Sequence, residues 1–106
     1  MARKAIKVRS TGPAARARAD GLQKSIVDWL QKNDLYHDTR VVISPREGLV
    51  GVILTEGPLY MLVNGYYETP AAERLLQQFT NMLRRHGLWY DLATAWKLTL
   101  HPLSRR

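Results

Sequence analysis

The chain has 106 residues, a formal net charge of +7, 45% apolar residues and no cysteine. This composition excludes a fully disordered chain, a disulfide framework and thiolate metal sites. No apolar run approaches the roughly 18–20 residues that span a bilayer, so the sequence predicts no membrane partner.

The N-terminal residues are predicted to form either a short edge strand or a flexible arm. Residues 4–9 alternate polar and apolar side chains, with Ile6 and Val8 on one face, as in a half-buried strand. Lysine at a sheet edge discourages edge-to-edge aggregation, which fits a strand. A cluster of turn-forming residues at 10–13 ends the segment, and the sequence leaves both alternatives open.

An amphipathic helix follows, and its start is predicted either near Pro13 or near Asp20. Pro13 suits the first turn of a helix, whereas Asp20 followed by Gln23 resembles a capping box. Ala15 and Ala19 continue the apolar face backwards, which favours the longer helix. Four larger apolar residues recur at helical spacing on this face: Leu22, Ile26, Trp29 and Leu30.

Two strands are predicted after this helix. Residues 40–44 contain a β-branched run, and residues 49–55 are apolar on both faces, as expected of a central, buried strand. Gly51 lies inside the second strand and indicates either a bulge or a close approach of backbone.

A hairpin is predicted next, over residues 59–68. Asn64-Gly65 between apolar and aromatic residues is typical of a type I′ turn with positive φ at both central positions. Exposed aromatic side chains on a sheet can stack on the bases of single-stranded nucleic acid. Tyr66 and Tyr67 are consecutive and would face opposite ways, so core filling or a dimer contact is favoured. Three tyrosines of this hairpin are therefore candidate partner contacts: Tyr60, Tyr66 and Tyr67.

A second helix is predicted to begin at Thr69-Pro70, with threonine as the cap and proline at the first helical position. Its last turn carries Arg84, Arg85 and His86, where positive charge suits the helix dipole, and Gly87 ends it. Its apolar stripe consists of Leu75, Leu76, Phe79, Met82 and Leu83.

One long, half-buried strand is predicted over residues 92–101, because apolar and polar side chains alternate there until Pro102. Trp29 and Trp96 fit apolar stripes and are predicted to be core residues. Trp89 and Tyr90 follow the end of the second helix and are predicted to be exposed anchors for a partner.

The predicted element order is therefore (β)-α-β-β-β-β-α-β. Helices on one face of a mainly antiparallel sheet make a two-layer α+β sandwich, here with four to six strands and two helices. A strand at residues 4–9 would create a ferredoxin-like split βαβ with an extra hairpin, an analogy that implies no function. We expect one α+β domain over 13–102, a basic arm or edge strand over 1–12, and a basic tail over 103–106.

Positive charge is concentrated at the start of the chain, and beyond it basic and acidic residues nearly balance. A basic arm on a near-neutral body binds phosphates by releasing counterions, with little sequence specificity. The sequence therefore predicts association with DNA or RNA. The residues expected to carry it lie in the arm, the start of the first helix and the tail: Arg3, Lys4, Lys7, Arg9, Arg16, Arg18, Arg105 and Arg106.

No catalytic or metal-binding motif is present in the sequence. The nucleophile elbow and both phosphate-binding glycine motifs are absent, and the three histidines lack metal-ligand spacing. We therefore expect no enzyme activity, no cofactor and no metal. One enzymatic alternative is a small RNA-cleaving toxin, whose phosphate would be surrounded by Tyr66, Tyr67, Arg84, Arg85 and His86.

A protein–protein assembly or adaptor subunit is the main alternative function. Two helices cover only one face of the predicted sheet, and an exposed apolar face needs a partner, such as a second copy. The arm of such a protein, for example a small phage or viral structural protein, would contact a neighbouring chain. The N-terminal residues also resemble a short organellar transit peptide, but without a secretory signal a cytoplasmic location is expected.

Overall fold

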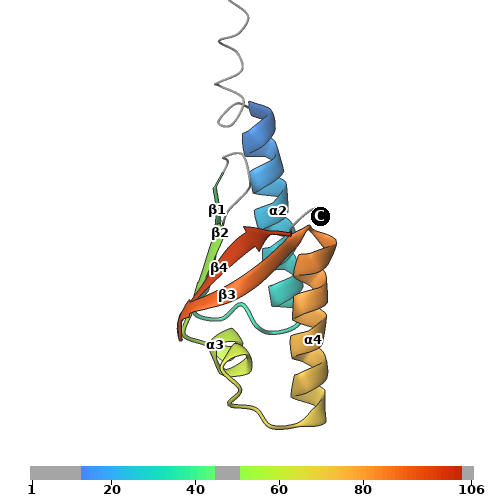
Figure 1. Ribbon diagram of the computed structural model, residues 1–106, viewed down its shortest axis with the longest axis vertical. Coiled ribbons are helices and arrows are strands. Elements are labelled where there is room, and N and C mark those ends of the chain that lie inside the picture. The colour runs from blue at the N-terminus through green and yellow to red at the C-terminus, as the bar shows by residue number, and fades with distance from the viewer. Residues whose placement is uncertain (1–12, 45–50, 104–106) are drawn as a thin grey trace, which may run out of the picture.

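The computed structural model describes residues 13–44 and 51–103 (Figure 1). The elements are α2 (Pro13–Lys32), β1 (Thr39–Ile43), β2 (Gly51–Thr55), α3 (Pro58–Val63), α4 (Pro70–Arg85), β3 (Leu88–Thr94) and β4 (Lys97–Pro102). All strand pairs are antiparallel, in the order β1-β2-β4-β3 across the sheet. The predicted two-layer α+β fold is therefore confirmed. The predicted strand at 4–9, and with it the ferredoxin-like variant, lies outside the described residues.

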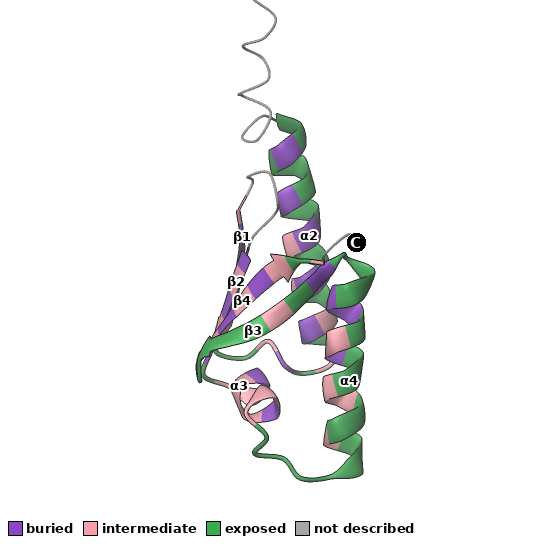
Figure 2. Ribbon diagram, viewed as in Figure 1, coloured by how far each residue is buried: buried purple, intermediate pink, exposed green. Residues whose placement is uncertain are grey.

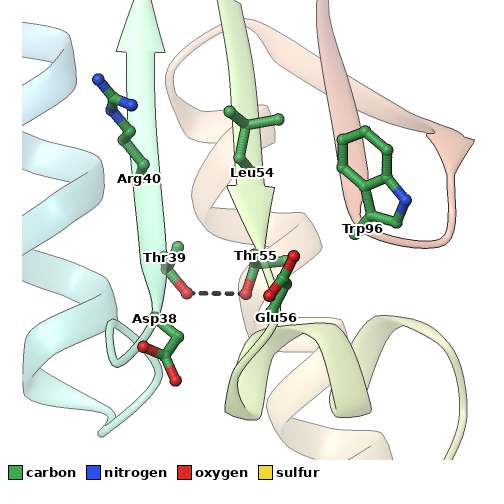
Figure 3. A pocket seen from close by; sticks show the side chains of 7 residues that line it. All are labelled: Asp38, Thr39, Arg40, Leu54, Thr55, Glu56 and Trp96. Atoms are coloured by element: carbon green, nitrogen blue, oxygen red, sulfur yellow. Dashed lines mark hydrogen bonds between the residues drawn. The ribbon is translucent and has the colours of Figure 1, made fainter.

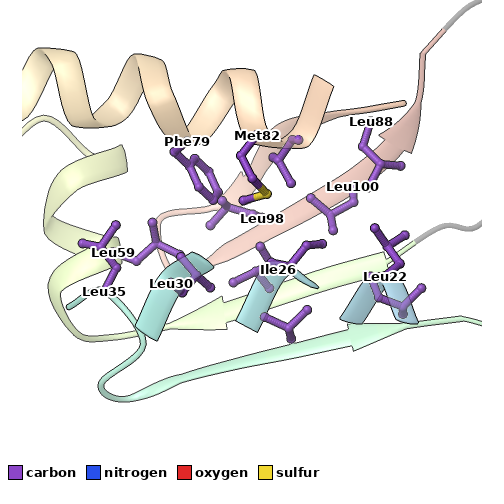
Figure 4. Packing of buried hydrophobic residues seen from close by; sticks show 14 of the residues in the cluster. Leu22, Ile26, Leu30, Leu35, Leu59, Phe79, Met82, Leu88, Leu98 and Leu100 are labelled. Carbon is purple, nitrogen blue, oxygen red and sulfur yellow. The ribbon is translucent and has the colours of Figure 1, made fainter. Parts of the chain in front are cut away.

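Helices α2 and α4 cover the same face of the sheet, and the core lies between them and the strands (Figure 4). Side chains alternate across a strand, and one set in each strand is buried against the helices. The buried strand residues include Val41, Ile43, Ile53, Leu88, Leu98 and Leu100. The buried helix residues that meet them include Leu22, Ile26, Leu30, Phe79, Met82 and Leu83. The outer sides of both helices are exposed (Figure 2).

Helix α2 begins at Pro13, so the longer of the two predicted helices is correct. Ala15 and Ala19 are buried and extend the apolar stripe into the first half of the helix. Gly21 lies on the exposed side, where an added Cβ would have nothing within 4 Å.

Replacement of Gly21 by alanine is expected to raise the free energy of unfolding by about 1 kcal/mol, because alanine has the higher helix propensity. Urea denaturation followed by circular dichroism measures this change. Gly65→Ala is the control, since Gly65 also has open space but adopts φ +76°. That variant should lose about 1 kcal/mol, because a Cβ is strained in this conformation. A destabilised Gly21→Ala variant would contradict a continuous helix.

The predicted hairpin over residues 59–68 is wrong, and helix α3 takes its place. Pro58 occupies its first turn, and Leu59 and Leu62, three residues apart, are both buried. Asn64 has φ −95° and only Gly65 has positive φ, so no type I′ turn forms. The Asn64 side-chain amide instead donates to the carbonyls of Tyr60 (2.9 Å) and Ala95 (2.7 Å). A five-residue apolar run is too short to distinguish the period of a helix from that of a strand. Pro58 favours the helix, because proline is well tolerated in a first helical turn.

The predicted strand over residues 92–101 is two strands joined by a tight turn at Ala95 and Trp96. Leu92 and Leu98 lie directly opposite each other in the β3–β4 pair, but the register then shifts, and Thr94 pairs with Lys97. The strict period of two is therefore broken just before the turn. Trp96 was predicted to be a core residue, but the turn leaves it 48% exposed. Trp29 is half-buried and packs against the core, with its ring 5.9 Å from that of Phe79.

Helix α4 begins and ends where the sequence predicts. The Thr69 hydroxyl accepts the backbone N–H of Ala72 at 3.1 Å, and Pro70 is the first helical residue. His86 is the C-cap, and Gly87 then adopts φ +77°, which turns the chain into β3. Within β2, Gly51 marks the predicted close approach, since a Cβ there would lie 2.6 Å from Ile43 Cδ1.

Candidate nucleic-acid interface

Two of the predicted phosphate-binding residues, Arg16 and Arg18, lie on the exposed side of the first half of α2. The buried Ala15 and Ala19 hold this part of the helix against the core, so both arginines point toward solvent. The remaining residues of this prediction lie outside the described residues: Arg3, Lys4, Lys7, Arg9, Arg105 and Arg106.

A second group of cations, Arg84, Arg85 and His86, ends α4, and all three are exposed. Helices α2 and α4 run antiparallel, so the end of α4 and the first half of α2 lie in the same half of the molecule (Figure 1). The sequence analysis did not connect the two groups, because about 65 residues of chain separate them. The helix arrangement places them in the same half of the molecule, with the end of α4 beside the middle of α2 (Figure 1).

The chain enters and leaves the described fold in this same half (Figure 1). Pro13 is the first residue of α2, and the basic sequence of residues 1–12 is joined to it. Leu103 donates its backbone N–H to the carbonyl of Gly87 at 2.8 Å, directly beside the cations that end α4. The two basic terminal sequences are therefore joined to the half that carries both arginine pairs, which we call the basic half.

No carboxylate lies within ion-pair distance of the arginines of the basic half, within residues 13–44 and 51–103. The only Lys or Arg ion pair among these residues joins Lys24 to Asp28 at 3.1 Å. At the end of α4 the cations also interact favourably with the negative end of the helix dipole. Four arginines of the basic half are also exposed, so an external anion can reach them: Arg16, Arg18, Arg84 and Arg85.

The opposite half of the molecule has no excess of positive charge among the described residues. Five exposed acidic residues lie there, in the loops around β1 and β2 and at the start of α4: Asp34, Asp38, Glu56, Glu68 and Glu73. Four basic residues in this half nearly balance the five negative charges: Lys32, Arg40, Arg74 and Lys97. A polyanion is therefore expected to approach the basic half.

The cluster predicted for an RNA-cleaving toxin is not assembled. Tyr66 and Tyr67 precede α4, whereas Arg84, Arg85 and His86 lie at its other end. The 16-residue helix between them is about 24 Å long. The three tyrosines also do not lie on a sheet, because Tyr60 belongs to α3 and packs edge-to-face on Tyr66, with ring centroids 5.7 Å apart. The alternative of a tyrosine platform on a sheet for stacking bases, which the sequence analysis did not favour, is therefore not formed.

Trp89 and Tyr90, predicted to be exposed together, face opposite sides of β3. Trp89 is 43% exposed and stacks on His101, with ring centroids 4.4 Å apart. Tyr90 is half-buried against Phe79 at 5.4 Å, and this burial raises the pKa of Tyr90. The prediction of an exposed anchor fits Trp89 and is wrong for Tyr90, because consecutive strand residues point to opposite faces.

A pocket of about 420 Å³ lies at the end of the sheet in the opposite half (Figure 3). Its base includes a hydrogen bond between the hydroxyls of Thr39 and Thr55 at 2.7 Å. Two carboxylates and one guanidinium line it, so its charge does not favour a phosphate. The complete lining is Asp38, Thr39, Arg40, Leu54, Thr55, Glu56 and Trp96.

Comparisons with protein-family models, with curated proteins and with solved structures find no match to this chain. Across residues 13–44 and 51–103, no group of three or more histidine, aspartate or glutamate side chains is placed to hold a metal ion. No helix in the same ranges has the length and hydropathy needed to cross a membrane. The basic half is therefore the candidate site that the geometry supports best.

Proposed function

We propose that this chain is a small, non-enzymatic nucleic-acid-associated protein that holds phosphates with its basic arm and its basic half. One observation carries the proposal. The fold brings exposed, unpaired arginines from α2 and α4 to the half of the molecule to which the basic arm is joined. The arginines of α2 and α4 would then contact phosphates in addition to those that the basic arm contacts.

Arginine suits this role because its planar guanidinium stays charged and binds phosphate oxygens through two parallel hydrogen bonds. Contacts of this kind position a protein along the backbone and do not read the bases. We therefore expect DNA and RNA of any sequence to bind, with an affinity that falls as salt rises. Such a protein would act in the cytoplasm or wherever the cell exposes nucleic acid.

The test is a salt titration of binding to labelled single- and double-stranded DNA and RNA, followed by fluorescence anisotropy. Each phosphate contact adds about 0.9 to the slope of log K against log salt on duplex DNA. The double variant Arg84→Ala/Arg85→Ala should therefore lower that slope by up to about 2. Arg16→Ala/Arg18→Ala should act similarly, and neutral glutamines in place of Arg3, Lys4, Lys7 and Arg9 should lower it further.

The matched control is Arg74→Ala, which removes an exposed arginine from the other end of the same helix. Its slope should equal that of the unchanged protein. Equal losses for Arg74→Ala and for the α4 end variants would contradict a localised interface. Absence of binding by the unchanged protein at low salt would overturn the proposed function as a whole.

A further inference from the structure

The face of the sheet opposite the helices is left uncovered by the described residues. Strand alternation places one set of side chains on it, and β3 is exposed along most of its length (Figure 2). The uncovered face consists of Arg40, Val42, Val52, Leu54, Trp89, Asp91, Lys97, Thr99 and His101. The side chains on this face therefore contact either solvent or a binding partner.

Apolar side chains gather on the β1–β2 side of the uncovered face. Val42 of the edge strand β1 is 47% exposed, and Val52 and Leu54 of β2 beside it are half-buried. Trp89 adds a large ring on the other edge strand, and Trp96 stands beside Leu54 at the end of the sheet (Figure 3). The central strand β4 presents polar side chains between these apolar groups, and such a mixed surface is typical of protein–protein interfaces.

Opposite charges occupy the two edges of the uncovered face. Arg40 lies on β1, at one edge of the sheet, and Asp91 lies on β3, at the other. Lys97 is the second cation of the face, while Asp38 and Glu56 line the pocket at its end. The face is therefore not basic enough to attract a polyanion, and its charge pattern is complementary to itself.

We propose that the uncovered face binds a second copy of this chain in a two-fold symmetric dimer. A two-fold axis parallel to the strands lays β1 of each copy over β3 of its partner, as in aligned packing of two sheets. Val42 and Trp89 then bury their exposed side chains at both edges of the interface. The interface is formed by the sheets alone, so it exists independently of nucleic acid.

The same rotation brings Arg40 of each copy toward the carboxylate of Asp91 across the interface. Arg40 is one two-residue step along its strand from the row of Val42, Val52, Thr99 and Asp91. That step is about 7 Å along the strand, and facing sheets lie about 10 Å apart, a distance that the arginine and aspartate side chains close together. Two such pairs form in a symmetric dimer, one at each edge, and they fix the orientation of the two copies.

Sedimentation equilibrium over a range of protein concentrations tests this dimer, with the full chain and no nucleic acid present. The unchanged protein should show a monomer–dimer equilibrium. Val42→Asp should weaken its Kd at least about tenfold, because it puts a carboxylate into the apolar part of the interface. The control Tyr66→Asp changes a side chain that is 57% exposed but lies away from the sheet, and its Kd should be unchanged.

A charge exchange tests the orientation of the two copies and does not depend on the apolar contacts. Arg40→Glu and Asp91→Arg should each weaken the dimer, and the double variant should recover most of the lost affinity. Circular dichroism establishes that each variant is folded. A strictly monomeric unchanged protein would overturn the proposal. So would equal effects of Val42→Asp and Tyr66→Asp, or a Trp89→Ala variant that loses binding to single-stranded nucleic acid while the protein stays monomeric.

Discussion

Replacement of Phe79 by alanine is expected to lower the free energy of unfolding by about 3–5 kcal/mol, the largest effect of any single change considered. Phe79 is completely buried on α4. Its ring lies 5.9 Å from Trp29 of α2 and 5.4 Å from Tyr90 of β3, so one side chain joins both helices and the sheet. Its removal leaves a cavity that three elements must close together.

Urea denaturation followed by far-UV circular dichroism measures this loss, since Trp29 beside the cavity complicates fluorescence. Leu75→Ala is a suitable comparison, because Leu75 lies on the same helix but is only half-buried. It should lose clearly less stability than Phe79→Ala. A Phe79→Ala variant within about 1 kcal/mol of the unchanged protein would contradict the arrangement of α2 and α4 over one core.

Gly57→Ala is expected to be the second most damaging change, with a loss of about 3 kcal/mol. The added Cβ would overlap the carbonyl oxygen of His37 and lie 3.0 Å from its carbonyl carbon. Both obstacles are backbone atoms, which cannot rotate away as a side chain can. The preceding residue also holds the two backbone segments together, because Glu56 donates its N–H to the carbonyl of Asp38 at 3.0 Å.

The same denaturation experiment measures the Gly57→Ala loss. Glu56→Ala is the control, because Glu56 is exposed and its change should stay within about 0.5 kcal/mol. Similar stabilities for the two variants would show that the loop before β1 does not pack against the start of α3. The glycine would then serve only as an ordinary N-cap.

Elements with several independent signals were predicted well from the sequence. Helix α4 has a capping threonine, a proline at its first position, an apolar stripe and a terminal glycine, and all of these signals agree. The region after β2 has only a short apolar run before Asn64-Gly65. Because Asn-Gly is typical of hairpin turns, this region was wrongly predicted as a hairpin. Asn64 instead becomes the C-cap of α3, and its amide donates to the carbonyls of Tyr60 and Ala95. The contact with Ala95 comes from a distant part of the chain, so no local pattern predicts it.

The candidate site was predicted only in part, because it depends on how distant elements meet. Arg16 and Arg18 follow from the charge distribution, but their relation to Arg84 and Arg85 follows from the antiparallel packing of α2 and α4. An uncovered sheet face was likewise expected in general. The side chains on this face could be identified only from the strand register. Trp96 was predicted to lie in the core, but the turn at Ala95 and Trp96 leaves it exposed.

The buried stripe of α2 changes in size along the helix, and this gradient gives its two halves different stabilities. The first half buries only the methyl groups of Ala15 and Ala19, whereas the second half buries Leu22, Ile26 and Leu30. Local opening costs least where little apolar surface is lost to water. We therefore expect the first turns of α2 to open more readily than the rest of the helix. Under the proposed function, Arg16 and Arg18 would then adjust their positions to the phosphates that they contact.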